Sequence, residues 1–165
     1  MIFIDEMKKL TADYENELSH KDEKEIEKYM IRLKNYIRNR VARGEKVVSQ
    51  ENWLLFRADY PEYVEIEPRM GLLGATIRWS LTSKAVEKLK SIEAVAAKEG
   101  ITITGFSFVL GNGHGDDASS YDYNRFYADY GVLRIPKNYC APYVNTIKNP
   151  REWHVYVSIS FCFSI

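Results

Sequence analysis

The sequence has few cysteines, no long apolar run and no net charge, and each of these shortages excludes a class of protein. It contains two cysteines, Cys140 and Cys162, which are too few for a disulfide scaffold and are not spaced as a zinc or redox pair. We therefore expect a reducing, cytoplasmic location. The longest mostly apolar stretch, residues 155–165, is about half as long as a membrane helix, so no membrane span is predicted.

The charges balance, with 23 Lys+Arg against 23 Asp+Glu, so no overall field draws the protein toward nucleic acid. Locally, acidic residues dominate positions 5–27 and basic residues dominate positions 28–46. The helix dipole favours acids at a helix N-terminus and bases at its C-terminus by about 0.3 to 1 kcal/mol each. This explains the pattern without a nucleic-acid partner, and direct nucleic-acid binding is not expected.

Apolar periodicity predicts that residues 1–48 are helical. One stripe consists of Ile26, Met30, Leu33, Ile37 and Val41, which recur every three or four residues. A second run with helical spacing consists of Leu10, Tyr14 and Leu18. Between the two runs we expect a break at Ser19 and His20, with Asp22 as the N-cap of the second helix and Gly44 at its end. The segment is thus predicted to be a helical hairpin.

The remaining residues, 49–165, predict a sheet-containing body. Ser49 has the features of a helix start, and Pro61 would end that short helix. A second, clearer helix is expected from an N-cap at Ser83 to a left-handed stop at Gly100. Alternating or β-branched patterns predict strands, which are expected over residues 75–81, 101–110 and 153–165.

These elements define the predicted fold class. It is α+β, with an N-terminal helical hairpin packed with a mainly antiparallel sheet and one well-defined central helix. The whole chain, residues 1–165, is predicted to be a single domain. If the strand at 153–165 lay on a sheet edge, it could pair across a two-fold axis and produce a homodimer.

Residues 111–131 differ in composition from the rest of the chain. They include four Gly, four Tyr and four Asp in 21 positions. Gly, Asp and Ser disfavour regular structure, and a loop of this length inside a compact domain is uncommon unless it has a function. This segment therefore supplies the candidate binding residues, which are Asp116, Asp117, Tyr121, Asp122, Tyr123, Arg125, Tyr127, Asp129 and Tyr130.

Tyrosine offers a large, stiff contact surface at low entropic cost, as in antibody binding loops. The four aspartates against Arg125 leave the segment with a net charge of minus three, which favours a basic partner surface. We expect a non-enzymatic interaction module, a small inhibitor or adaptor of the mobile-element type, that binds a basic, nucleic-acid-binding protein. The alternative to a binding role is a structural one, in which residues 123–130 form a short amphipathic helix with Tyr123, Phe126, Tyr127 and Tyr130 on its packed face.

The alternative function is a metal-assisted hydrolase or phosphoesterase. His114, Asp116 and Asp117 offer one imidazole and two carboxylates to a metal ion. Their spacing matches neither a phosphate-binding loop nor a calcium loop, so no metal or other cofactor is predicted. No catalytic residue is predicted.

The strand at 153–165 also carries His154 and Cys162 on one face. About eight residues at ~3.3 Å each separate them, too far for a Cys–His catalytic pair. We expect His154 and Tyr156 to form a polar patch, joined by Thr76 and Arg78 if the two strands pair.

Overall fold

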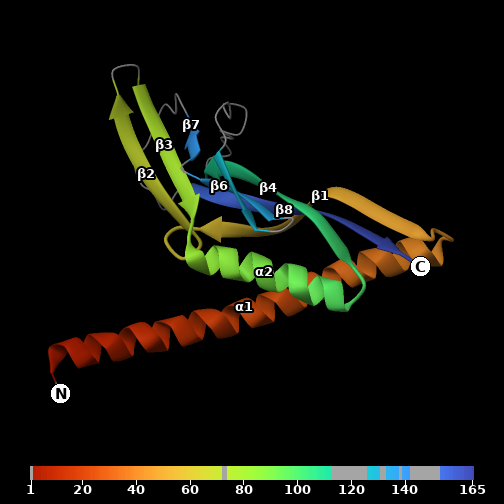
Figure 1. Cartoon of the computed structure of the whole chain (residues 1–165), viewed down its shortest axis with the longest axis horizontal. Helices are drawn as coiled ribbons and strands as arrows, with labels where there is room; N and C mark the ends of the chain where they lie inside the picture. The colour runs from red at the N-terminus through yellow and green to blue at the C-terminus, as the bar shows by residue number, and fades with distance from the viewer. Residues whose placement is uncertain (1, 72–73, 113–125, 131–132, 138, 142–152) are drawn as a thin grey trace. The chain divides into compact units, whose positions relative to one another are not determined.

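The computed structural model describes residues 2–71, 74–112, 126–130, 133–137, 139–141 and 153–165 (Figure 1). The chain divides into two compact units, Met1–Glu45 and Lys46–Ile165. The first unit contains helix α1, and the second contains helix α2 and strands β1 to β8. The architecture is α+β, as predicted, while the single-domain organisation stays a prediction.

Helix α1 runs without interruption from Phe3 to Ala42, so the predicted hairpin is wrong. No glycine or proline occurs within these bounds, and neither Ser19 nor His20 is a strong enough helix breaker to stop propagation. Pairs such as Lys21 and Glu25, four residues apart and 4.0 Å between charged atoms, support the helix just after the predicted break.

The predicted apolar stripe of α1 is confirmed at four of its five positions, because Ile26, Met30, Leu33 and Ile37 are buried. Asp22 is not an N-cap, since it lies inside the helix. Gly44 does follow the C-terminus with a positive φ of 95°, a conformation that L residues rarely adopt.

The second unit contains three antiparallel groups of strands, which confirms the mainly antiparallel sheet. The largest has the order β1-β8-β4, formed by β1 (Val47–Asp59), β8 (Trp153–Ser164) and β4 (Thr102–Asn112). A second has the order β2-β3-β7, formed by β2 (Val64–Gly71), β3 (Gly74–Leu81) and β7 (Tyr139–Ala141). Strands β5 (Phe126–Tyr130) and β6 (Leu133–Lys137) pair with each other.

Residues from Ser49 onward, where a short helix was predicted, belong to strand β1, so that prediction is wrong. The capping signal at Ser49 is local, whereas β1 forms a long ladder with β8 from the pair Val47–Ser164 to the pair Asp59–His154. This tertiary pairing outweighs the weak local preference. The polar run adopts a bulge instead, with Asn52 at a φ of 54°.

Strand β8 carries the core of the β1-β8-β4 sheet. Alternate residues of one face are fully buried, namely Trp153, Val155, Val157, Ile159 and Phe161. Because β8 lies between β1 and β4, it is not at an edge of this sheet. The predicted route to a homodimer through this strand therefore does not apply.

Helix α2 spans Ser83–Lys98 and packs on the sheet with its buried residues Ala85, Leu89, Ile92 and Ala96. Its N-cap is Thr82, one residue before the predicted Ser83, and the Thr82 hydroxyl accepts a hydrogen bond from the Ala85 backbone N–H at 3.3 Å. Gly100 supplies the predicted left-handed stop, with φ 77°. Across the described part of the chain, neither helix is apolar enough over a sufficient length to cross a membrane.

Candidate functional site

The predicted binding segment lies largely outside the described residues. This applies to His114, Asp116, Asp117, Tyr121, Asp122, Tyr123 and Arg125. What the structure does describe are its two flanks. Strand β4 ends at Asn112 and pairs with β8, and strand β5 begins at Phe126 and pairs with β6. In the sequence, the residues between these two strands therefore connect two different ladders.

Tyr127, Asp129 and Tyr130 belong to strand β5. In the ladder with β6 they oppose Pro136, Arg134 and Leu133 in turn. The amphipathic-helix alternative is therefore wrong over residues 126–130. Tyrosine and phenylalanine favour strands as much as helical packing, and pairing with β6 decides between the two.

His154 and Tyr156 do form a patch on one face of the β1-β8-β4 sheet, as expected. Their rings meet edge to face, with centroids 4.7 Å apart and an interplanar angle of 85°. The predicted neighbours Thr76 and Arg78 are not part of it, because β3 pairs with β2 and β7 and not with β8.

Strand β1 supplies the charged neighbours of this patch instead. Asp59 is the cross-strand partner of His154, and Arg57 is the cross-strand partner of Tyr156. The Arg57 Nε atom lies 2.8 Å from the Asp59 Oδ1 atom, which forms a half-exposed ion pair beside the imidazole. Sequence reasoning missed both residues because it placed a helix where β1 lies.

The environment of His154 favours its neutral form. The residue is only 4% exposed, and its Nε2 atom has no hydrogen-bond partner among the groups that the structure describes. Burial is the main cause that lowers the pKa of His154 below its ordinary value, and the positive charge of Arg57 lowers it further, while Asp59 acts in the opposite direction. The folded chain therefore favours the uncharged imidazole, in which one ring nitrogen donates a hydrogen bond and the other accepts one.

Small side chains occupy the rest of this face along β8, where Ser158, Ser160 and Cys162 follow Tyr156. Across this row of small side chains, the Ser107 hydroxyl of β4 donates a 3.4 Å hydrogen bond to the Asn52 Oδ1 atom of β1. The bulge at Asn52 and the serines of β8 together allow that reach. The face is thus polar and shallow.

No group of three metal-binding side chains gathers within the described ranges of the chain. Cys162 is a free, partly buried thiol on the same strand as His154. Eight positions of β8 hold the two about 26 Å apart, so they form no nucleophile–base pair.

Lys88 is a buried cation that sequence reasoning missed. It lies on the buried face of α2 and is 2% exposed. Its Nζ atom lies 4.2 Å from the ring centroid of Phe56 and 4.6 Å from that of Tyr63. Both distances are within the range of cation–π attraction. Its position between Ala85 and Leu89 on the apolar side of α2 was the available signal.

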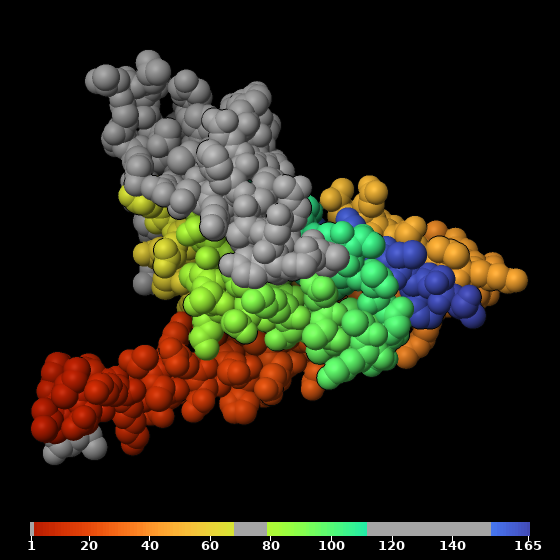
Figure 2. Space-filling model, viewed as in Figure 1, coloured from red at the N-terminus to blue at the C-terminus, as the bar shows by residue number. Residues whose placement is uncertain are grey.

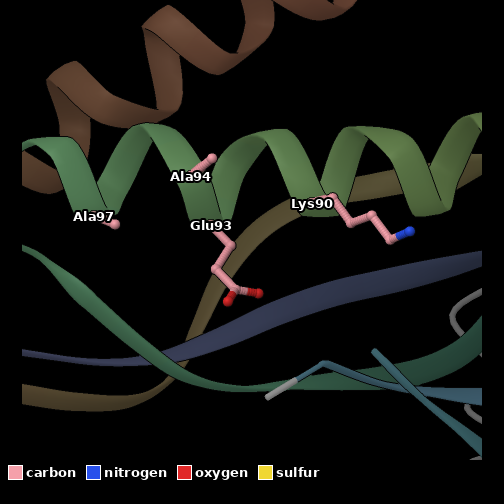
Figure 3. A pocket seen from close by; sticks show the side chains of 4 residues that line it. All are labelled: Lys90, Glu93, Ala94 and Ala97. Carbon is pink, nitrogen blue, oxygen red and sulfur yellow. The ribbon is translucent and has the colours of Figure 1, made fainter. Parts of the chain in front are cut away.

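An open pocket of about 420 Å³ lies along α2 (Figure 3). Among the described residues, its lining consists of Lys90, Glu93, Ala94 and Ala97. Lys90 and Glu93 extend to the same side of the helix in Figure 3. These four side chains include one cation, Lys90, and one anion, Glu93.

No protein-family model, curated protein or solved structure matches this chain.

Proposed function

We propose that this chain is a non-enzymatic protein-interaction module that binds a basic protein surface through residues 111–131. The observation that carries the proposal is the composition of this segment, with four tyrosines, four aspartates and a net charge of minus three. Tyrosine supplies contact area with little loss of entropy, and the aspartates select a positively charged partner.

Two strands support the segment as a binding element. It begins in the last residues of β4, which pairs with β8, and it contains β5, which pairs with β6. Recognition segments commonly project from such a rigid scaffold. A protein that covers the basic surface of a nucleic-acid-binding partner would act as a blocker or adaptor, in the manner of small inhibitors encoded by mobile elements.

The test compares capture of partners by the wild-type chain and by the double variant Tyr121→Ala/Tyr123→Ala, followed by calorimetry with the retained protein. Tyrosine hot spots typically contribute about 2 kcal/mol each, and their contributions are not additive, so we expect the double variant to bind between about 30-fold (the loss of one) and about 1,000-fold (the loss of both) more weakly. Replacing Asp116, Asp117 and Asp122 with Asn should also weaken binding, and the loss of affinity should be larger at low salt than at high salt, because salt screens the attraction between exposed charges.

A matched control replaces Glu51 and Glu87, which are exposed acids outside the segment, with Gln. This control should leave affinity unchanged. Equal affinity of the wild type and the tyrosine double variant would contradict the proposal. Metal-dependent phosphoesterase activity that disappears in a folded Asp116→Ala variant would replace it with the hydrolase alternative.

A further inference from the structure

One face of α1 combines exposed apolar side chains with charges of both signs. Phe3, Leu10, Tyr14 and Ile31 are between 50% and 71% exposed. In Figure 2 the helix that carries them is drawn in red to orange. At 100° per residue they fall on one side of the helix, opposite the buried stripe that contains Met30 and Leu33. Phe3, Leu10 and Tyr14 lie within about three turns of one another, and a cluster of large exposed apolar side chains is typical of an interaction surface.

The charges on this face change sign along the helix. The N-terminal half presents the exposed acids Glu6, Asp13 and Glu17, and the C-terminal half presents the exposed bases Lys24, Lys28 and Arg38. Lys21 is an exposed base of the N-terminal half on this face, and its charge is paired within the same helix by Glu25, at 4.0 Å. A parallel pair of such helices would place acids beside acids and bases beside bases. An antiparallel pair would place each acidic half against a basic half, which lowers the electrostatic energy.

We propose that α1 pairs with α1 of a second copy of this chain, antiparallel, about a two-fold axis between Asp22 and Glu23. In this arrangement Tyr14 faces Ile31 of the second copy, and Glu17 faces Lys28. The two-fold axis repeats each contact, so that the apolar pair and the charge pair each occur twice. Tyr14 and Ile31 are the exposed apolar residues nearest the axis on either side, and this register brings them together.

This surface is separate from residues 111–131, and its pairing does not depend on the proposed function. It also replaces the strand-mediated homodimer, because β8 is enclosed by β1 and β4. The occupant that the charge pattern selects is a second copy, since the required basic helix is present in the chain itself.

The test measures the dimer dissociation constant of the full-length chain by sedimentation equilibrium. In Glu17→Lys, two attractive pairs become repulsive, and Lys28→Glu has the same effect with the opposite sign. We expect each single variant to raise the dissociation constant at least about tenfold at low salt. An equimolar mixture of the two variants should favour the heterodimer over either homodimer. In the heterodimer, the lysine introduced at position 17 faces the glutamate introduced at position 28, which is an attractive pair with the signs exchanged. The unchanged Glu17 and Lys28 form the other pair and keep their original attraction.

The double variant Glu17→Lys/Lys28→Glu should also dimerise like the wild type. Glu15→Lys, an equal charge change at an exposed position on the other side of α1, is the matched control and should have no effect. A wild-type chain that stays monomeric up to submillimolar concentration would overturn the proposal. So would single variants that dimerise as tightly as the wild type, since a parallel or unrelated dimer does not join positions 17 and 28.

Discussion

His154 shows how one residue can make the stability of this chain depend on pH. Its pKa is lowered mainly by burial, so the folded state binds a proton less readily than the unfolded chain, in which the pKa is about 6.5. The stabilisation that follows is fully present above the unfolded pKa. It decreases as the pH falls from about 6.5 toward the lower pKa of the folded state.

We therefore expect the free energy of unfolding to fall over this acidic range in urea titrations at a series of pH values. The variant His154→Gln should lose the part of this slope that His154 causes. His20→Gln, at an exposed position, should retain it. Identical pH profiles for wild type and His154→Gln would contradict this assignment.

Lys88 illustrates a buried charge held by aromatic rings. Replacing it with Ala removes its packed aliphatic stem and its attraction to Phe56 and Tyr63, and leaves a cavity. We expect Lys88→Ala to lower the free energy of unfolding by about 2 to 4 kcal/mol, measured by urea denaturation. Lys98→Ala, exposed on the same helix, should change it by less than about 0.5 kcal/mol.

At the scale of elements, two adjacent hydroxyl residues at the start of α2 have different roles. Thr82 accepts from the Ala85 N–H and donates a 2.7 Å hydrogen bond to the Glu62 carbonyl oxygen, whereas Ser83 is exposed. We expect Thr82→Ala to cost about 1 to 2 kcal/mol and Ser83→Ala less than about 0.5 kcal/mol in thermal or urea unfolding. Equal effects would show that Ser83 shares the capping role.

The glycines after the two helices test backbone strain separately from packing. A Cβ atom at Gly44 would meet nothing within 4 Å, and one at Gly100 would lie 3.8 Å from Phe163 Cε2, but both residues have positive φ. We expect Gly44→Ala and Gly100→Ala each to cost about 1 to 2 kcal/mol in urea unfolding. Gly105→Ala, which has open space and no positive φ, should cost less, and a cost as large as theirs would contradict the strain explanation.

Elements with long, regular periodicity were predictable from the sequence. The strand at 153–165 and the helix ending at Gly100 were found close to their observed bounds, because their patterns reflect burial against one core. The errors at Ser19 and Ser49 have a common cause. Capping and breaking signals act over a few residues. At Ser19 the signal was too weak to stop the propagation of α1, and at Ser49 it was outweighed by the β1–β8 ladder, whose partner strand lies far away in the sequence.

The candidate site was predictable only in part, for a related reason. His154 and Tyr156 share a strand face, which alternation shows directly. Arg57 and Asp59 reach the same patch from β1, roughly 100 residues earlier in the chain, and no local pattern reports that pairing. Lys88 was overlooked because a lysine is almost never buried without a partner group, which here the rings of Phe56 and Tyr63 provide.

At the scale of the molecule, β8, the last strand of the second unit, pairs with its first strand, β1, and with β4 from the middle of its sequence. Ser158 opposes Leu54 of β1 and Ser107 of β4. We expect Ser158→Pro to disrupt the ladder and cost at least about 3 kcal/mol, measured by urea denaturation and amide exchange. Thr104→Pro is the control, since Thr104 has no partner in the β4–β8 register, and it should be tolerated better.

The position of β8 also has a consequence for how the chain is made. Ribosomes extend a chain at about 5 to 20 residues per second, so β1 emerges roughly 5 to 20 s before β8, its ladder partner among the described strands, has been synthesised. The β2–β3 hairpin and α2 need only local contacts and can form meanwhile. Throughout this interval the side chains of Leu55 and Phe56, which the folded chain buries, lack the strand that completes their ladder, and transiently exposed apolar surface of this kind favours aggregation.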